Sequence, residues 1–214
     1  MPRLATFLRC IEAQRAKAVF NPWREHDALT DADPAAAAAR RARLRAHLDC
    51  DPLLLLLGEA AGYQGCHVSG IPFTSERLLL AGAIPRVAVP QARLSTRATP
   101  WSEPSATIVW GVLHELGLAE RTILWNAFPW HPHRPGELQS NRTPTAAEVA
   151  LGRPVLSALL AAFPHVHVVA LGRKAETLLA GLGRVETALR HPAMGGAERF
   201  RAGLRAFARR LPGV

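Results

Sequence analysis

The alternation of apolar and polar positions along the chain predicts short buried strands separated by amphipathic helices. Four apolar runs have the length and composition of such strands: 53–57, 121–125, 166–171 and 184–189. Helical spacing predicts helices over 4–19, 35–48, 76–80, 102–116, 174–180 and 197–211, and a longer one opened by residues 143–145 with apolar positions at Leu151, Val155, Leu159 and Phe163. The proline-containing stretch 84–101 is expected to be irregular.

Strands that alternate with helices in this way indicate an α/β fold of three layers, α/β/α, around a central four-stranded parallel sheet with right-handed crossovers. A chain of 214 residues is long enough to bury one sizeable core, and no flexible linker or internal repeat divides it. We therefore expect a single domain over residues 1–214, in which the helical N-terminal part, 1–50, packs on the rest.

The composition is that of a globular chain, with 49% hydrophobic and only 20% charged residues. The longest apolar run, 53–57, is too short to span a bilayer. In addition, the basic N-terminal segment lacks the apolar stretch and cleavage site of a secretory signal. These observations predict a cytoplasmic protein without a membrane partner.

The formal net charge of +9 is carried almost entirely by arginine, since the only lysines are Lys17 and Lys174. A planar guanidinium group binds phosphate well, so this charge balance favours a polyanionic partner such as nucleic acid. The alternative is a GC-rich genome, which encodes arginine wherever a cation is needed.

The cysteines do not form a metal-binding motif. They number three, lie far apart, and include no C-x-x-C pair: Cys10, Cys50 and Cys66. This pattern argues against a structural zinc site or an iron–sulfur cluster held by cysteines alone. A mixed metal site is the alternative, although its spacing matches no closed zinc pattern; it would use His131, His133, Cys66 and His67. We expect no metal, with Trp130 and the two later histidines lining a nucleic-acid cleft instead.

Unusual loops follow all four expected strands. The first, 58–75, is rich in glycine; the others read NAFPWHPH from 126, LGRK from 171 and RHPAMGGA from 190. Because ligands bind beyond the carboxyl ends of parallel strands, these four loops are expected to meet at one edge of the sheet.

Each loop contributes a different chemical group to that edge. Gly58 allows the backbone to approach a ligand closely, Glu59 adds a carboxylate, and Phe73 offers a surface for stacking. Asn126 supplies an amide that both donates and accepts on the edge of a base. His191 precedes a run of small residues that leads into a helix, whose N-terminus attracts an anion.

The order and spacing of these groups resemble the uracil-DNA glycosylase superfamily. GEAAG at 58–62 resembles the first motif of the family, and IPFTS at 71–75 resembles the segment with the aromatic ring that stacks on uracil. Asn126 is similar to the asparagine that recognises the base, and HPA at 191–193 is similar to the second catalytic motif. The resemblance covers about three quarters of the chain, from the first strand to the last helix.

The resemblance implies a monofunctional DNA glycosylase of base excision repair, which hydrolyses the N-glycosidic bond of flipped-out uracil and leaves an abasic site. Its partners would be uracil-containing DNA and the abasic product, in the bacterial cytosol or nucleoid, and a monomer would suit the search along DNA. No metal or organic cofactor is implied. Without a lysine placed to form a Schiff base, Lys174 being only a remote candidate, the reaction would be hydrolysis alone.

The same resemblance implies roles for individual residues. His191 would face uracil O2, with Glu59 as the second catalytic residue, and Asn126 would read N3–H and O4. The base would also contact Phe73, Gly58 and Tyr63. Flanking DNA would be held by Arg190, Arg173, Lys174 and His133, and Met194 is the candidate for the side chain that fills the gap in the duplex.

The chain also departs from the family pattern. Ala60 stands where classical members carry the aspartate that orients the attacking water, so Glu59 becomes the candidate for that task. Gly62 replaces the tyrosine that excludes thymine, with Tyr63 one residue later. Three scattered cysteines do not supply the four that bind the iron–sulfur cluster of some members.

Ordinary structural explanations exist for each residue taken alone. Glycines serve turns, Phe73 can anchor a loop, Asn126 can cap a turn, Glu59 can bond neighbouring amides, and His191 can lie on the surface. A single cavity explains the set together. Two other functions remain open: a protein that binds uracil or abasic sites with little turnover, motivated by Ala60, and a nucleotide or nucleoside hydrolase on a similar sheet.

Overall fold

A four-stranded parallel sheet forms the centre of the computed structural model, which describes residues 2–184 and 186–212. Its strands are β2 (Leu54–Ala60), β3 (Thr122–Phe128), β5 (His167–Leu171) and β6 (Thr187–Leu189). They are arranged in the order β3-β2-β5-β6, and all three neighbouring pairs are parallel. The α/β fold with a four-stranded parallel sheet is therefore confirmed. Val185, inside the expected fourth strand, lies outside the described residues.

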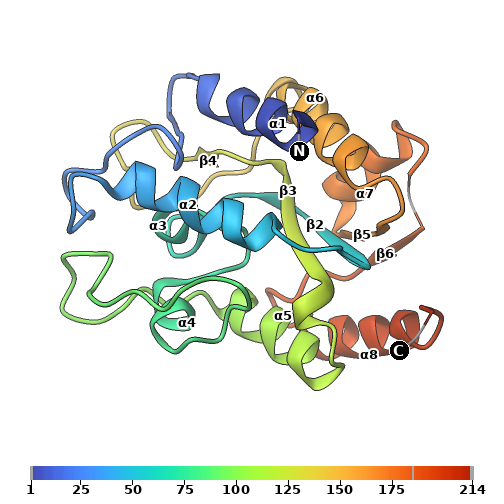
Figure 1. Ribbon diagram of the computed structural model, residues 1–214. Helices are drawn as coiled ribbons and strands as arrows, with labels where there is room; N and C mark the ends of the chain where they lie inside the picture. The colour runs from blue at the N-terminus through green and yellow to red at the C-terminus, as the bar shows by residue number, and fades with distance from the viewer. Residues whose placement is uncertain (1, 185, 213–214) are drawn as a thin grey trace.

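Helices cover both faces of this sheet. Figure 1 shows α1 (Pro2–Ala13), α6 (Ala146–Ala162) and α7 (Arg173–Ala180) on one side, and α5 (Pro104–Glu115) and α8 (Ala197–Ala208) on the other. The remaining helical elements are α2 (Ala36–Leu48), α3 (Cys66–Ser69), α4 (Glu76–Leu80) and a 3-10 turn, Ala119–Arg121. Among the described residues no helix is long and apolar enough to cross a membrane.

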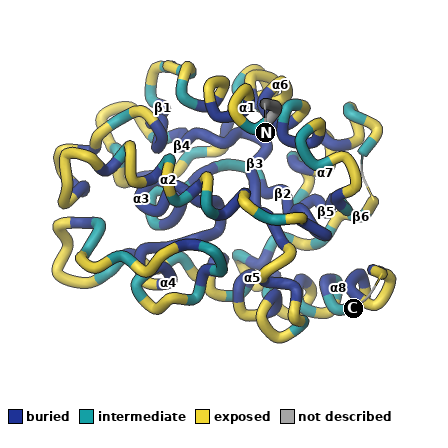
Figure 2. Tube along the Cα trace, viewed as in Figure 1, coloured by how far each residue is buried: buried dark blue, intermediate teal, exposed yellow. Residues whose placement is uncertain are grey.

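The apolar run of β2 explains how one strand holds the three layers together. Its side chains point alternately to the two faces, so Leu55 and Leu57 join the cluster with α1 and α6, while Leu54 and Leu56 join the cluster with α5 and α8. All four are fully buried, and most of β2, β3 and β5 is dark blue in Figure 2.

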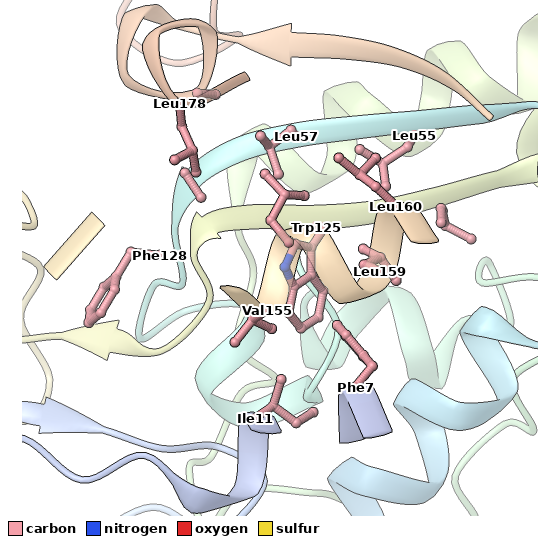
Figure 3. Close-up of a cluster of buried hydrophobic side chains, with 14 of the residues drawn as sticks. Phe7, Ile11, Leu55, Leu57, Trp125, Phe128, Val155, Leu159, Leu160 and Leu178 are labelled. Atoms are coloured by element: carbon pink, nitrogen blue, oxygen red, sulfur yellow. The ribbon is translucent and has the colours of Figure 1, made fainter. Parts of the chain in front are cut away.

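Trp125 of β3 is one of the largest buried side chains on the first of these faces. Figure 3 shows its indole surrounded by Phe7 and Ile11 of α1 and by Val155 and Leu159 of α6. The ring of Phe7 meets it edge-on, with centroids 4.9 Å apart. Helix α1 is thus fixed to the sheet through the strand that carries Asn126.

Two details of the expected elements are wrong. The first helix ends at Ala13 rather than at residue 19, because Ala18 adopts a positive φ of 53° and Val19–Phe20 forms a short strand, β1, antiparallel to β4 (His131–Pro132). The apolar stripe expected on the long helix includes Leu151, but that side chain is 46% exposed. The helix packs through Val155 and Leu159 instead.

The proline-containing stretch 84–101 is irregular as expected, and a buried carboxylate holds it in place. Glu76 is fully buried and accepts hydrogen bonds from the backbone N–H groups of Leu94, Ser95 and Trp101. It also pairs with Arg93 at 2.9 Å. Although burial alone would raise the pKa of Glu76, these partners lower it. The stretch leads directly into α5, so Glu76 also positions the start of that helix.

Candidate active site

A cavity of about 870 Å³ opens at the carboxyl end of the sheet. The loops after β2, β3 and β6 contribute to its wall, and the start of α5 closes it from another side. Glu59, Phe73, Asn126 and His191 all line it, together with Glu103. Three segments far apart in the sequence, around Phe73, Asn126 and His191, therefore meet in one cavity.

Gly58 shows how closely these groups are packed. A Cβ atom at this position would lie 2.5 Å from the ring of Phe73 and 2.6 Å from the amide of Asn126. Phe73 itself adopts a positive φ of 50° and is only 6% exposed. A glycine at the end of the strand is thus required for the aromatic ring and the amide to approach each other.

Asn126 is held by backbone groups on both sides of its amide. The side chain is 2% exposed, and it is satisfied when its oxygen accepts from the N–H of Ala61 and its nitrogen donates to the carbonyl of Trp125, each at 3.2 Å. One lone pair of the oxygen and one hydrogen of the nitrogen are left over. The fixed amide can therefore offer a ligand one acceptor and one donor.

His191 presents its other ring nitrogen as a donor. The Nδ1 atom accepts from the backbone N–H of Ala193 at 3.1 Å, so in the neutral ring the proton resides on Nε2. Burial lowers the pKa of His191, and Arg190 adds to that effect, while Glu59 opposes it. The ring lies beside Phe73, with centroids 5.7 Å apart and planes inclined by 38°. At neutral pH the cavity thus contains a neutral imidazole with a defined donor.

Glu59 lies between this cavity and an adjoining hollow of about 590 Å³. Its carboxylate pairs with the Nζ atom of Lys174 at 3.2 Å, and the same Nζ donates to the carbonyl of Pro144 at 2.8 Å. Arg173 and Arg190 also line the hollow. This arrangement places three cations beside the cavity, where they suit the phosphates of a polyanion.

Met194 stands at the rim of the cavity and is 94% exposed. Its φ is 52° and that of the following Gly195 is 75°, so the loop between β6 and α8 turns sharply there. A positive φ is uncommon for a residue other than glycine, so this turn holds Met194 in a strained conformation at the rim.

Several of the expected site residues lie elsewhere. The ring of Tyr63 packs edge-on against Trp101, with centroids 5.3 Å apart. Among the described residues that line the cavity, Tyr63 is missing. His133 is likewise absent from that lining, and its Nδ1 atom faces the carbonyl of Arg134 at 2.9 Å. Gly58 is also missing from that lining, and Arg173 and Lys174 line the adjoining hollow instead.

The structure adds two polar residues that the sequence did not point to. Asn141 lines the cavity, and its amide atoms lie 3.5 Å from where a Cβ of Gly62 would be. Its Oδ1 atom accepts from the N–H of Tyr63 at 3.1 Å. Glu103 lines the cavity from the start of α5. In the sequence, Glu103 is marked only by a helix start and Asn141 only by its place in a loop, because contacts with the distant loop after β2 bring each to the cavity.

The histidines considered as metal ligands form a hydrogen-bonded chain instead. His67 contacts Asp27 through Nε2 at 3.0 Å and His131 through Nδ1 at 2.9 Å, and His131 contacts the carbonyl of Ser140 through Nε2 at 2.8 Å. All three side chains are buried. In the part of the chain that the structure describes, no group of three His, Cys, Asp or Glu side chains is arranged to hold a metal.

This chain of three hydrogen bonds ends in two acceptors, the carboxylate of Asp27 and a carbonyl oxygen. Three hydrogen bonds would need three N–H groups on the two rings, and thus one positive charge balanced by Asp27. Burial opposes that charge, because it lowers the pKa of His67 and lowers that of His131 to about 3. Burial alone would raise the pKa of Asp27, but hydrogen bonds from His67, Thr30 and the backbone of Leu29 lower it to about 2. The cluster holds the N-terminal segment against the loops after β2 and β3.

Comparison with known proteins agrees with this geometry. The family model described as "Uracil DNA glycosylase superfamily" matches residues 46–211. No curated protein sequence matches the chain. Among solved structures, wild-type SMUG2 of Pedobacter heparinus is similar in fold, with a TM-score of 0.62 and 17% sequence identity over 97% of each chain. Because the family model covers most of the chain, from before β2 to beyond α8, the protein belongs to the uracil-DNA glycosylase superfamily.

Proposed function

We propose that the protein is a monofunctional DNA glycosylase that hydrolyses the N-glycosidic bond of uracil flipped out of DNA and leaves an abasic site. The observation that supports this most strongly is the shared cavity of Phe73, Asn126 and His191. An aromatic surface, a fixed amide and a neutral imidazole donor are the groups needed to stack on, read and activate an extruded pyrimidine.

Base selectivity would come from Asn126. Its free acceptor and donor match N3–H and O4 of uracil, and the backbone contacts with Ala61 and Trp125 oppose rotation of the amide. Cytosine has an acceptor at N3 and a donor at N4. Binding cytosine would therefore leave buried polar groups facing like partners, which costs several kcal/mol.

Bond cleavage would depend on His191. As the glycosidic bond breaks, negative charge develops on uracil, and the Nε2–H of a neutral imidazole can donate to O2 without first losing a proton. A single donor placed where an anion forms typically contributes about 3–4 kcal/mol of transition-state stabilisation. Glu59 would offset part of the positive charge that develops on the sugar at the same time.

Lys174 is not placed to act as a nucleophile. Its Nζ atom is engaged by both Glu59 and the carbonyl of Pro144. Schiff-base chemistry needs a free amine beside the sugar, so this arrangement supports a glycosylase that does not cleave the DNA strand.

The surroundings of the cavity suit a duplex with one extruded base. Arg173, Arg190 and Lys174 would hold the phosphates next to the lesion, and Met194 would enter the space that the base leaves. Extruding a base costs a few kcal/mol and least for a mispaired one, so we expect U:G to be the preferred duplex.

The test is base release from labelled oligonucleotides that contain U:G, U:A, single-stranded U, T:G, xanthine or hypoxanthine, followed by alkali. We expect an alkali-labile site at uracil, and rates about 10²–10³-fold lower for His191→Ala. Asn126→Ala should also lose turnover far more than affinity for duplex. Glu120→Gln is the matched control, because Glu120 is 73% exposed at the opposite end of β3. Equal rates for wild type and either cavity variant would contradict the proposal.

The second candidate is a protein that binds uracil or abasic sites with little turnover. The observation that favours it is Ala60, which lines the cavity where a water-orienting aspartate is expected. Cleavage at none of the oligonucleotides, together with retained affinity for an abasic duplex, would support this function instead.

A further inference from the structure

Glu103 is a carboxylate of the cavity that no motif assigns. It is the residue before α5, is partly buried, and lines the same cavity as Phe73, Asn126 and His191. A Cβ atom on Gly65 would lie 1.8 Å from its Oε2 atom and 2.9 Å from its Cδ atom. The side chain therefore fills the space that a glycine leaves free in the loop after β2.

This carboxylate has no structural task that we can identify among the described residues. It stands at the N-cap position of α5, where acidic side chains commonly bond to the first N–H groups, yet it makes no such bond. Between the residues that the structure describes, Glu103 forms hydrogen bonds only through its backbone carbonyl, which accepts from Thr107. Burial raises the pKa of Glu103 to about 7, and no cation offsets that effect.

Other carboxylates near the site differ from Glu103 because their side chains have protein partners. Glu59 is paired with Lys174 and is 39% exposed. Glu76 is fully buried but saturated by an arginine, a hydroxyl and three backbone N–H groups. Both have cationic partners, Lys174 and Arg93. Among the described residues, Glu103 alone of these three carboxylates has no ion pair or hydrogen bond on its side chain.

A reaction of water at the sugar needs such a group. An acceptor works best when its affinity for protons matches the ambient pH, since it must be ionised before the step and protonated after it. Ala60 has no polar atom on its side chain, and Glu59 is engaged by Lys174. The sequence predicted that Glu59 positions the attacking water. The contacts of the two carboxylates favour Glu103 for this task instead.

We propose that Glu103 is the catalytic residue that accepts the proton of the attacking water, which extends the proposed function to the step that Ala60 leaves unfilled. The carboxylate of Glu103 takes one proton from water while the water oxygen forms a bond to C1′ of the deoxyribose. The bond between C1′ and N1 breaks, and its electron pair leaves with uracil as an anion, which accepts a hydrogen bond from His191. Solvent then protonates the released uracil and removes the proton from Glu103.

The experiment measures single-turnover release of uracil from a U:G duplex at saturating protein between pH 5.5 and pH 9. For the wild-type protein we expect the rate to rise about tenfold between pH 6 and pH 8, as the carboxylate ionises. Glu103→Gln keeps the shape of the side chain and removes the acceptor. We expect it to be slower by about 10²-fold or more at pH 8 and to lose the rise with pH.

Two controls separate catalysis from positioning and charge. Glu59→Gln should lower the rate but keep the rise with pH, and Glu120→Gln should leave both unchanged. Gly65→Ala supplies an independent perturbation, because the added methyl group must displace the carboxylate of Glu103. We expect this variant to approach Glu103→Gln in rate, and the double variant to be no slower than Glu103→Gln alone, since both changes remove one interaction.

Retention of the wild-type rate and of its rise with pH in Glu103→Gln would overturn the inference. The inference would also be overturned if the effects of Gly65→Ala and Glu103→Gln on the rate of uracil release were fully additive in the double variant. Failure of the proposed function looks different, because the wild-type protein would then release no uracil at any pH. Affinity of each variant for an abasic duplex, measured in parallel, shows that its DNA-binding surface is folded.

Discussion

Two of the histidine sites that the structure describes have opposite surroundings. His191 stands in the wall of an open cavity, with one ring nitrogen bound to a backbone N–H and the other available. His67 and His131 are buried side by side, and all four of their ring nitrogens have protein partners, with Asp27 and the carbonyl of Ser140 at the ends.

The difference shows how the same side chain serves two purposes. A buried polar group whose hydrogen bonds are complete contributes to stability and specificity of the fold, and it has no capacity left for a substrate. A polar group that keeps one free donor in a cavity gives up some stability and can act on a ligand. We therefore expect changes at the buried pair to affect unfolding, and changes at His191 to affect turnover.

The largest effect is expected from Asp27→Asn. This change replaces the buried carboxylate that His67 contacts with a neutral amide, and removing one charged partner of a buried, hydrogen-bonded pair costs about 3–5 kcal/mol. Denaturant unfolding at pH 7 measures the loss. The rate of uracil release per folded molecule should change much less, and a large loss of rate without a loss of stability would contradict the assignment of this cluster to structure.

Acid unfolding tests the same cluster in the wild-type protein. Because the pKa of Asp27 is lowered from 3.8 to about 2 in the folded state, its contribution to stability is present above about pH 4 and is lost as the pH falls through 2. In Asp27→Asn this component of the pH dependence should be missing.

His191→Ala should give the reverse pattern. We expect turnover to fall about 10²–10³-fold, equivalent to about 3–4 kcal/mol, because the donor to the developing anion is removed. Stability should change by less than about 1 kcal/mol, since the ring is only partly buried and makes a single hydrogen bond. Unfolding by denaturant and single-turnover kinetics on the same sample distinguish the two effects.

Glu103→Gln extends the comparison to a carboxylate. Its expected effect on stability is smaller than that of Asp27→Asn. The pKa of Glu103 is raised from 4.5 to about 7 in the folded state, so its favourable contribution is present below about pH 4.5 and is lost as the pH rises through 7. At pH 8.5 the glutamine variant should be more stable than wild type by about 1–3 kcal/mol, and at pH 4.5 the two should be alike. Thermal unfolding at the two pH values measures the difference.

Met194→Ala should have the smallest effect on the free protein. The side chain is 94% exposed, so we expect stability to change by less than about 0.5 kcal/mol. Release of uracil from duplex should slow several-fold, because the space left by the base is not filled, whereas release from a single strand should be nearly unaffected. Equal slowing on both substrates would contradict a role as wedge.

The sequence predicted the parallel sheet well because its signals are local. The leucine run of β2 and the apolar runs of β3 and β5 identify buried strands by composition alone, and the capping pair Thr145 and Glu148 marks the start of α6. Residues at the ends of such strands could therefore be placed on one edge, which is why Phe73, Asn126 and His191 were found together.

The remaining features depend on contacts between distant segments. The length of α1 is set by the pairing of β1 with β4, which no local pattern shows. The carboxylate of Glu103 reaches the cavity because Gly65 in another loop leaves room for it. His67 and His131 resemble scattered ligands in the sequence, and only their shared position beside Asp27 in the fold reveals a closed hydrogen-bonded chain.

Direct detection of free uracil tests the central proposal best. The wild-type protein and His191→Ala would each be incubated in excess with a U:G duplex, and the released base would be quantified against the affinity of each protein for abasic duplex. The expected result is uracil release by wild type, a 10²–10³-fold slower release by the variant, and similar affinities. Equal rates of release for the two proteins, or no release by wild type, would contradict the assignment of the cavity to uracil excision.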